Sequence, residues 1–476
     1  MNRLIRNSFW AVSVMALLAL SACDDELELP DNLVDFEAAE LGFGASESEL
    51  TINITLSREA EAEGTINVQA ALTGLTYGTE FTTEPAMAGN AVALPVAAGA
   101  TAASLKVKKV PGTLLDGDEQ ITFTLQSVSE SLVLGEKKEL KLSFAEIVAV
   151  QATVDPSVGG PLQPNKVFID LSANRQQSLS RGAWDLGFAT ANGQFRVILN
   201  SSSAMMALAV NKTDINAVTA ADTAGLGIKL STDAIFAAAT SQNPPSWLNE
   251  AKNWIDEPTG DLTKTAIAEI AATEADNKVY IVNRGKNPDN TQRGWKKVRI
   301  LRNGTGYTVQ HADIAATSFQ TIQVSRNDAY AFNYINFNSG AVEVEPTKDK
   351  WDIAFTVFTN TTALGPTTLI PYVFLDVVLQ NREAVQAVQV PTSTISYENF
   401  GEANLTGLTF SSSQLAIGTN WRTGGGPNSG PAVRTDRFFV VKDADNNYYK
   451  LRFTALAQNG ERGRPRFEFA LVKKGS

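Results

Sequence analysis

Trp184-Asp185-Leu186-Gly187-Phe188 and Trp351-Asp352-Ile353-Ala354-Phe355 decide the fold of this 476-residue chain, because the second stretch repeats the first 167 residues later. Asn253-Trp254 and Asn420-Trp421 are separated by the same distance. A repeat that keeps its spacing indicates a duplicated unit, which forms either two tandem copies or one pseudo-symmetric body.

Flanking segments repeat in the same order and set the limits of the duplication. Upstream, Phe168-Ile169-Asp170-Leu171 matches Tyr334-Ile335-Asn336-Phe337. Downstream, Trp295-Lys296-Lys297-Val298-Arg299-Ile300 matches Tyr448-Tyr449-Lys450-Leu451-Arg452-Phe453. Residues 151–476 therefore contain two copies, at 165–317 and 331–473.

Each copy is rich in strand patterns and ends in a strand pair. These pairs are expected at 279–282 with 297–300, and at 438–441 with 450–456, and the alternation at 466–471 indicates a final strand. The first copy also has helical composition from Thr232 to Ala272. Pro244-Pro245-Ser246 can start a helix with Trp247, Ala251 and Trp254 on one face, and residues 266–270 extend the pattern. The sequence predicts a duplicated all-β region with a short helical insertion.

Residues 33–148 show the period-two pattern of strands with one buried face. Ile52, Ile54 and Leu56 alternate with polar residues, as do Ile121, Phe123 and Leu125, and turn residues fall between such runs. This spacing predicts an antiparallel β-sandwich. The segment resembles a Calx-beta domain in three places: Val34-Asp35-Phe36, Gly78-Thr79-Glu80-Phe81 and Asp116-Gly117-Asp118-Glu119-Gln120-Ile121-Thr122-Phe123.

The Calx-beta resemblance raises the question of calcium, which those domains can bind through clustered carboxylates. Ca²⁺ takes six to eight oxygen ligands. Glu80, Asp116, Asp118 and Glu119 are available here, but the run of adjacent aspartates of the calcium-binding members is missing. Acidic residues are also ordinary turn formers. The sequence favours a spacer sandwich over a calcium site.

The amino terminus has the features of a lipoprotein signal peptide, residues 1–22. Arg3 and Arg6 precede an apolar run too short to span a bilayer, which ends in Leu20-Ser21-Ala22-Cys23. Cys23, the only cysteine, is the expected site of lipidation. Residues 23–32 are acidic and form a tether, and acidic residues directly after the cysteine resemble the tag that sends some lipoproteins to the cell surface. In enterobacterial sorting, an Asp next to the cysteine would instead mean retention at the inner membrane. We expect an outer-membrane, lipid-anchored protein with no other membrane segment.

Composition excludes several functions. Removal of the two signal-peptide arginines takes the formal net charge from −11 to −13, which argues against nucleic-acid binding. The single histidine, His311, excludes a paired-histidine zinc site, and lipidation of Cys23 leaves no thiol nucleophile. No Gly-x-Ser-x-Gly elbow or phosphate-binding loop is present. The sequence predicts a protein that is not an enzyme.

The duplicated region resembles the HmuY family of exported haem-capturing lipoproteins, with the second copy the better match. The resemblance rests on the Trp-Asp motif of that copy, on Ile417-Gly418-Thr419-Asn420-Trp421, on residues 448–453 and on Gly463-Arg464-Pro465-Arg466-Phe467-Glu468-Phe469. It implies an all-β carrier that holds haem iron between two His or Met side chains and passes haem to an outer-membrane receptor.

The sequence departs from this family where the iron ligands are expected. HmuY-like proteins often carry a histidine shortly after the Trp-Asp motif, where this chain has residues 356–358 and 189–191, none of them histidine. If haem binds through this chain, the candidate ligands are His311 with Met205 or Met206, since thioether sulfur also ligates haem iron. The competing interpretation places Met205 in the core and His311, partly exposed, at a strand end.

Two functions follow from these patterns. The first is a HmuY-like haem-binding protein acting at the outer membrane in haem or iron acquisition, with haem or haem proteins and an outer-membrane receptor as partners. The second is a surface binding or scaffold lipoprotein that keeps the HmuY-like fold without binding haem.

Overall fold

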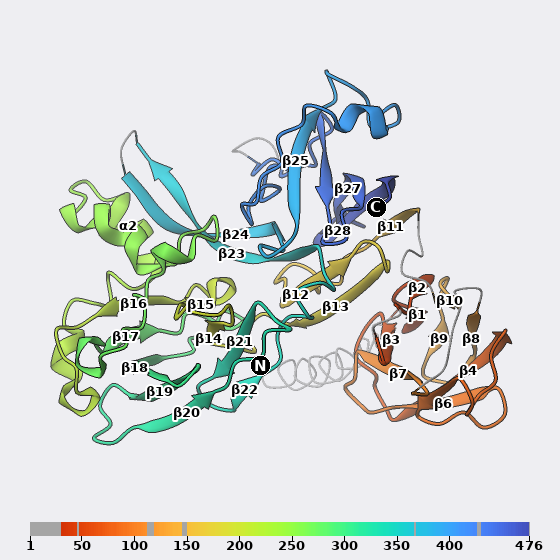
Figure 1. Cartoon of the computed structure of the whole chain (residues 1–476), viewed down its shortest axis with the longest axis horizontal. Coiled ribbons are helices and arrows are strands. Elements are labelled where there is room, and N and C mark those ends of the chain that lie inside the picture. The colour runs from red at the N-terminus through yellow and green to blue at the C-terminus, as the bar shows by residue number, and fades with distance from the viewer. Residues whose placement is uncertain are drawn as a thin grey trace, which may run out of the picture. The chain divides into compact units, whose positions relative to one another are not determined.

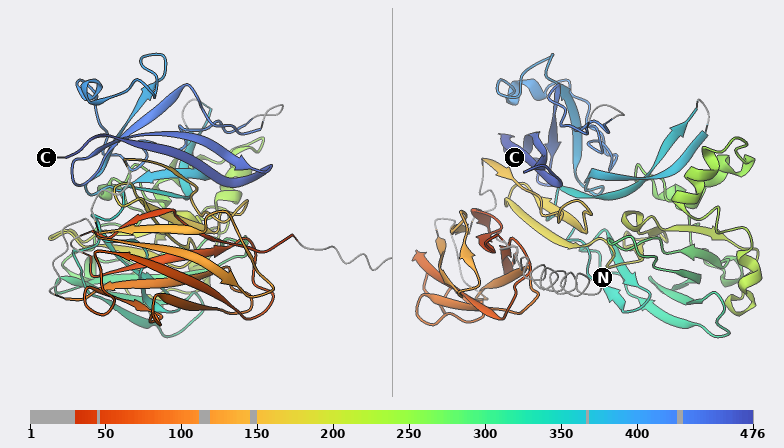
Figure 2. Two further views of the ribbon diagram at one scale, coloured as in Figure 1. Left: turned by 90° about the vertical axis from the view of Figure 1, so that its right-hand side faces the viewer. Right: turned by 180° about the vertical axis from the view of Figure 1, so that it is seen from behind.

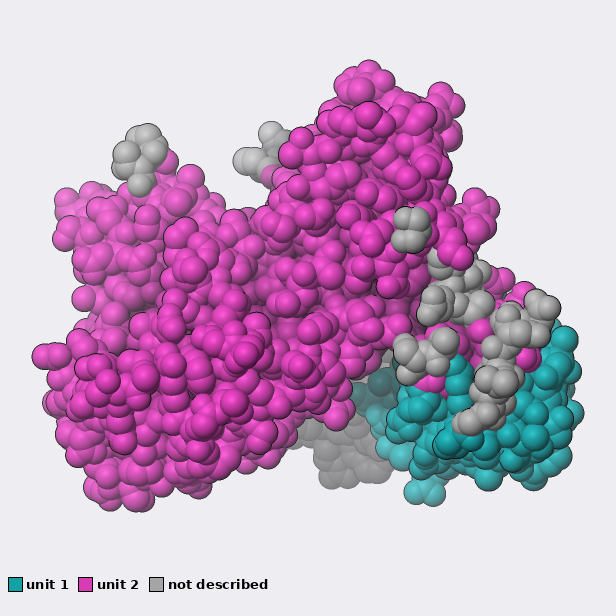
Figure 3. Space-filling model, in the orientation of Figure 1, with its two compact units in different colours: residues 1–39, 48–113, 121–140 teal, residues 40–47, 114–120, 141–476 magenta. Residues whose placement is uncertain are grey.

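The computed structural model describes residues 30–44, 47–111, 119–144, 150–365, 368–425 and 430–475. The expected signal peptide, Cys23 and most of the acidic tether lie outside these ranges. The chain forms two compact units (Figure 3): one holds most of the N-terminal sandwich, and the other holds residues 141–476 with the short segments 40–47 and 114–120. Within the described ranges, no helix has the length and apolarity needed to cross a membrane.

The segment from Leu33 to Ser143 forms two five-stranded sheets, as its alternating pattern predicts. In β3, Ile52, Ile54 and Leu56 are buried, and in β8, Ile121 and Phe123 are fully buried. One sheet has the order β5 (Phe81–Glu84), β7 (Ala102–Lys109), β3 (Glu49–Leu56), β1 (Leu33–Phe36), β9 (Val133–Leu134). The other has the order β2 (Glu40–Gly42), β10 (Glu139–Ser143), β8 (Gln120–Val128), β4 (Gly64–Thr73), β6 (Ala91–Val96).

The duplicated region folds into two lobes of two sheets each, which we call the inserted lobe and the split lobe. The inserted lobe is built from one continuous stretch of chain. Its sheets are β15 (Val197–Leu199), β14 (Leu186–Ala189), β21 (Phe332–Asn336), β22 (Gly340–Val342), and β16 (Met206–Ala209), β17 (Tyr280–Asn283), β18 (Trp295–Asn303), β19 (Gly306–Asp313), β20 (Gln320–Val324).

The split lobe combines strands from both ends of the region. Figures 1 and 2 show β11–β13 beside β23 and β28, although these strands are far apart in sequence. The sheets are β13 (Arg175–Ser180), β12 (Asn165–Asp170), β23 (Ile353–Leu364), β24 (Thr368–Gln380), and β11 (Gln151–Val154), β28 (Glu461–Lys473), β27 (Tyr448–Gln458), β26 (Arg437–Lys442), β25 (Gln386–Pro391).

The two sequence repeats exchange strands to build these lobes. β12 of the first repeat pairs with β23 of the second, and β21 of the second pairs with β14 of the first. The strand that precedes each repeat also pairs with the other repeat. β11 precedes the first repeat and pairs with β28 of the second repeat, and β20 precedes the second repeat and pairs with β19 of the first repeat. The region is therefore one pseudo-symmetric body, since each repeat completes the sheets of the other.

The helical insertion of the first repeat lies against the long β23–β24 hairpin. Figure 1 shows α2 (Thr232–Ala239) beside this hairpin, and η4 (Ser246–Trp254), a run of 3₁₀ turns, also contacts β24. Shorter 3₁₀ turns are η1 (Ser201–Ser203), η2 (Ile215–Ala217), η3 (Ala220–Thr223), η5 (Leu262–Lys264), η6 (Glu274–Asp276) and η7 (Glu402–Leu405).

The prediction that helix continues through residues 266–270 is wrong. This segment is not helical, because its backbone bonds to other parts of the lobe instead of to its own preceding turn. Ala268 N donates to the Tyr280 hydroxyl, and Ile270 N donates to the Phe195 carbonyl. Ile267 and Ile270 fill the core of the inserted lobe.

Candidate ligand-binding sites

The two Trp-Asp motifs lie where the lobes pack together, and each tryptophan packs on an aromatic ring from the other repeat. Trp184 contacts Tyr334 with ring centroids 4.8 Å apart, and Trp351 contacts Phe168 at 4.9 Å; both pairs are edge-to-face. All four rings belong to one buried cluster between the lobes. The tryptophans are thus core anchors, as their repetition indicates.

The aspartates of the motifs connect the repeats through the backbone. Asp185 accepts a hydrogen bond from Phe337 N, and Asp352 accepts one from Leu171 N, both at 2.8 Å. A buried asparagine also holds the backbone around each motif. Asn200 donates to the carbonyls of residues 181 and 184, and Asn381 donates to those of residues 348 and 351. The motif is a structural joint that is used twice.

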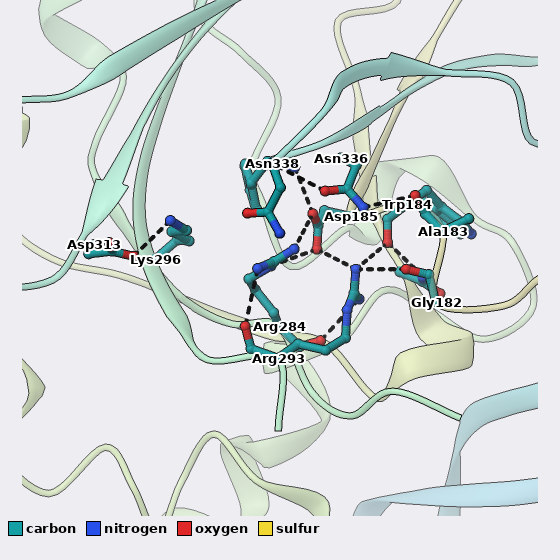
Figure 4. Close-up of polar contacts among 12 residues, drawn as sticks. Gly182, Ala183, Trp184, Asp185, Arg284, Arg293, Lys296, Asp313, Asn336 and Asn338 are labelled. Carbon is teal, nitrogen blue, oxygen red and sulfur yellow. Dashed lines mark hydrogen bonds and ion pairs between the residues drawn. The ribbon is translucent and has the colours of Figure 1, made fainter. Parts of the chain in front are cut away.

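Charge distinguishes the two joints. Asp185 pairs with Arg284 and Arg293 at 2.9 and 2.8 Å, and all three side chains are buried (Figure 4). No described lysine or arginine forms an ion pair with Asp352. Burial, followed by the nearby charges of Asp170 and Asp443, raises the pKa of Asp352 well above its ordinary value.

His311 lies on β19 with 1% of its surface exposed, so the expectation of a partly exposed histidine is wrong. Its ring packs on Phe337 at 5.1 Å, and its Nδ1 has no hydrogen-bond partner. Burial lowers the pKa of His311, and the charge of Lys296 acts in the same direction. This neutral, enclosed ring is part of the interior of the inserted lobe.

Met205 and Met206 fill two different cores. Met205 belongs to the core of the inserted lobe, and Met206 to the core beneath α2 and η4. Met205 shares its core with Val309, two residues before His311 on β19, so Met205 and His311 occupy one face of the sheet.

A shared face does not make Met205 and His311 a pair of axial ligands. β17 and β18 separate β16 from β19, so the two backbones are about 14 Å apart at the usual strand spacing. Side chains on one face stand roughly parallel to each other and do not point at opposite sides of a flat ligand.

Of residues 356–358, where the HmuY resemblance leads us to expect a histidine, Thr356 contacts the first repeat, whereas Val357 and Phe358 line the two cavities described below. Thr356, Val357 and Phe358 are at most 4% exposed. The Thr356 hydroxyl lies 2.9 Å from that of Ser202 on η1, and Thr359 donates to the Ser201 carbonyl at 2.7 Å. The first repeat therefore occupies the face of β23 where an iron ligand is expected. Ala189 and Thr190 in the first repeat are also buried.

Described residues of both lobes line a small cavity and a larger one. The smaller, of about 50 Å³, is lined by Trp184, Trp351 and Gln380, and the indole N–H groups and Gln380 Oε1 are buried without hydrogen-bond partners. Lys166 and Glu345 also line it; burial lowers the pKa of Lys166 to about 8 and raises that of Glu345. This volume holds only a few water molecules.

The larger interlobe cavity has a volume of about 280 Å³ and mixes apolar with polar walls. The split lobe contributes Val357, Val373 and Leu375. The inserted lobe contributes Ser203, Thr232, Asn283, Lys286 and Gln292, and Arg181 enters from the connection between the lobes. Sequence reasoning missed Arg181; its position three residues before Trp184 was the available signal.

A third cavity, of about 490 Å³, lies within the split lobe beside Tyr397 and Phe438. Two of the arginines that line it are already neutralised. Arg437 pairs with Asp436, and Arg452 pairs with Glu398 and Glu468.

The carboxylates considered for calcium do not form a site among the residues that the structure describes. Asp116 and Asp118 lie outside the described ranges. Glu80 accepts a hydrogen bond from Thr76 N at 2.6 Å, as expected of a turn residue. In the described part of the chain, no group of three or more His, Cys, Asp or Glu side chains could hold a metal ion.

The chain is similar to a few solved structures at low identity. The apo-form Calx CBD1 domain is 13% identical, with a TM-score of 0.21 over 24% of this chain and 97% of that chain. A putative carbohydrate binding protein from Bacteroides ovatus is 11% identical, with a TM-score of 0.17 over 94% and 99%. A two-domain protein of unknown function from Bacteroides fragilis is 11% identical, with a TM-score of 0.18 over 41% and 72%. TM-scores this low give no information on function, and the Calx-beta assignment stays a prediction.

Sequence comparison identifies the duplicated region. No curated protein matches the chain. The family model described as HmuY protein matches twice, at residues 162–324 and 328–469, one match for each repeat. These matches cover more than half of the sequence, so the chain belongs to the HmuY family.

Proposed function

We propose that this chain is an exported, lipid-anchored surface binding protein that keeps the HmuY fold but does not coordinate haem iron through axial side chains. The observation that carries the proposal is the contact between Thr356 and Ser202, which fills one of the three expected ligand positions with the protein's own first repeat. Membership of a family of binding proteins supports a binding role and not catalysis.

The second candidate is a haem carrier for haem or iron acquisition, and family membership favours it. Under this reading, haem or a haem protein is the partner and an outer-membrane receptor accepts the cargo. Because His311, Met205 and Met206 are all buried, iron ligation by any of them requires the core to open.

A haemin titration of the purified mature chain separates the two functions. We expect the spectrum to remain that of free haemin at micromolar protein. A Soret shift that saturates near one haem per chain would overturn the proposal. In that case, His311→Ala, Met205→Ala and Met206→Ala would show whether the sequence-predicted ligands hold the iron.

The membrane anchor needs its own test, since Cys23 lies outside the described residues. We expect labelled palmitate to be incorporated into the wild-type chain and not into Cys23→Ala, which should be released in soluble form. Digestion of intact cells by added protease would show whether the protein faces outward, as the acidic tether predicts. Labelling of the Cys23→Ala variant would refute the anchor assignment.

A further inference from the structure

Arg181 is a buried cation without an anionic partner. Its side chain is only 7% exposed, and no described carboxylate forms an ion pair with it. Nε donates to the Gln163 carbonyl at 3.0 Å, and Nη1 donates to the Ser202 carbonyl at 2.6 Å. These neutral acceptors hold the guanidinium in place but do not balance its charge. Burial, followed by the like charge of Arg293, lowers the pKa of Arg181.

This situation differs from that of the other buried arginines of the joint. Arg284 and Arg293 share the carboxylate of Asp185, as buried charges normally do. The equivalent of Arg181 in the second repeat is Lys348, whose backbone carbonyl also accepts from an asparagine but whose side chain is exposed. Burial of an uncompensated charge at only one joint points to a ligand that supplies the missing anion.

Arg181 lines the 280 Å³ interlobe cavity, whose other charges cancel. Lys286 pairs with Asp233 at 2.5 Å, and both line the same cavity. Arg181 therefore leaves one net positive charge. A guanidinium can pair with a carboxylate or a phosphate, but its single charge balances a carboxylate and leaves one charge of a phosphate dianion unbalanced.

The remaining walls indicate what is attached to that carboxylate. The Ser203 hydroxyl is buried with no hydrogen-bond partner, and Thr232 and Gln292 add polar groups. Val357, Val373 and Leu375, all from the split lobe, add an apolar part to the lining. The volume equals that of about nine water molecules, which suits a ligand of monosaccharide size and is far too small for a porphyrin.

We propose that the interlobe cavity binds a small hydroxylated monocarboxylate of hexuronate size, with Arg181 as its counter-ion and Ser203 as a hydroxyl partner. This inference deepens the proposed binding function by naming a ligand class. Because both lobes contribute lining residues, a bound ligand would contact both lobes.

Isothermal titration of the mature chain with D-glucuronate, D-glucose and inorganic phosphate tests the proposal. We expect glucuronate to bind at least tenfold more tightly than either of the other two. Arg181→Gln should weaken glucuronate binding at least tenfold and leave the weak glucose signal unchanged. Lys348→Gln removes the equivalent exposed cation and should bind like the wild type.

A second variant guards against misfolding of Arg181→Gln. Leu162 lines the cavity but is 52% exposed, so Leu162→Glu places a negative charge at the rim without disturbing the core. We expect it to weaken glucuronate binding at least tenfold. The proposal is overturned if glucuronate does not bind, if phosphate binds as tightly, or if both variants bind like the wild type. The haemin result bears only on the proposed function, so failure of one inference does not imply failure of the other.

Discussion

The charge difference between the two Trp-Asp joints predicts that the same substitution will have very different costs in the two repeats. Asp185→Asn keeps the shape of the side chain but removes the negative charge with which Arg284 and Arg293 both pair. Asp185 is fully buried, and the two arginine side chains are 7% and 3% exposed. Breaking a buried ion pair from one side typically costs about 3–5 kcal/mol, because the remaining charge stays buried. We therefore expect Asp185→Asn to lower the free energy of unfolding by about 4 kcal/mol.

Asp352→Asn is the matched control. No described cation pairs with Asp352, and its raised pKa favours the neutral carboxyl form, which an amide resembles. The amide oxygen can still accept the hydrogen bond from Leu171 N. We expect a loss below about 1 kcal/mol, the usual range when no charge or packing is lost.

Urea denaturation followed by tryptophan fluorescence at pH 7 measures both variants. Trp10 lies in the expected signal peptide, and the other six tryptophans all lie at residue 184 or beyond, so the signal reports the duplicated region alone. Equal losses for Asp185→Asn and Asp352→Asn, or a loss below about 1 kcal/mol for Asp185→Asn, would refute the reasoning.

Three further predictions concern the packing of the lobes. Burial raises the pKa of Asp256 to about 6 from 3.8, so the folded state binds more protons and stability falls as pH rises from about 4 to about 6. One pKa unit corresponds to about 1.36 kcal/mol, so the free energy of unfolding of Asp256→Asn should rise by up to about 3 kcal/mol relative to that of the wild type as pH increases across that window. Urea denaturation at a series of pH values measures this difference. Gly285→Ala should lower the free energy of unfolding by about 3 kcal/mol or more in the same assay. The reason is that φ of Gly285 is +71° and a Cβ there would lie 1.8 Å from the Ser203 carbonyl oxygen. A smaller loss would show that the backbone can shift to make room for the Cβ. Thr356→Val should lower the free energy of unfolding by about 1–2 kcal/mol, because it leaves the Ser202 hydroxyl unpaired. In thermal denaturation, the double variant Thr356→Val with Ser202→Ala should lose less stability than the two single variants added together. Fully additive losses would contradict the contact.

Periodicity and repetition predicted most of the fold. The strand pairs of both repeats, the final strand and the N-terminal sandwich all form where the alternation of apolar residues places them. The exchange of β12 and β21 between repeats could not be predicted, because alternation reports which face of a strand is buried and not which strand lies beside it. Residues 266–270 were misassigned because short apolar runs fit a helix or an extended segment equally well.

The candidate site was less accessible to sequence reasoning. A ligand count gave His311, Met205 and Met206 as the candidate haem ligands, but composition does not report burial, and all three side chains are buried. The position of Arg181, three residues before Trp184, places it beside the Trp-Asp motif, but the sequence does not show whether this arginine has a carboxylate partner in the fold. Only the arrangement of the two lobes shows which acids are absent around it.

The exchange of strands between the repeats also determines the order in which the chain can fold. During synthesis the inserted lobe has all its strands once Val342 has emerged, so it can close early. The split lobe cannot form early, because Gln151 pairs with Ala470 and Val167 pairs with Phe355, and both partners are synthesised much later. Until then β11, β12 and β13 present unpaired edges that invite pairing with other chains. Loss of β28 would leave β11 without its partner, so the last strand of the duplicated region determines whether the first strand of that region is paired.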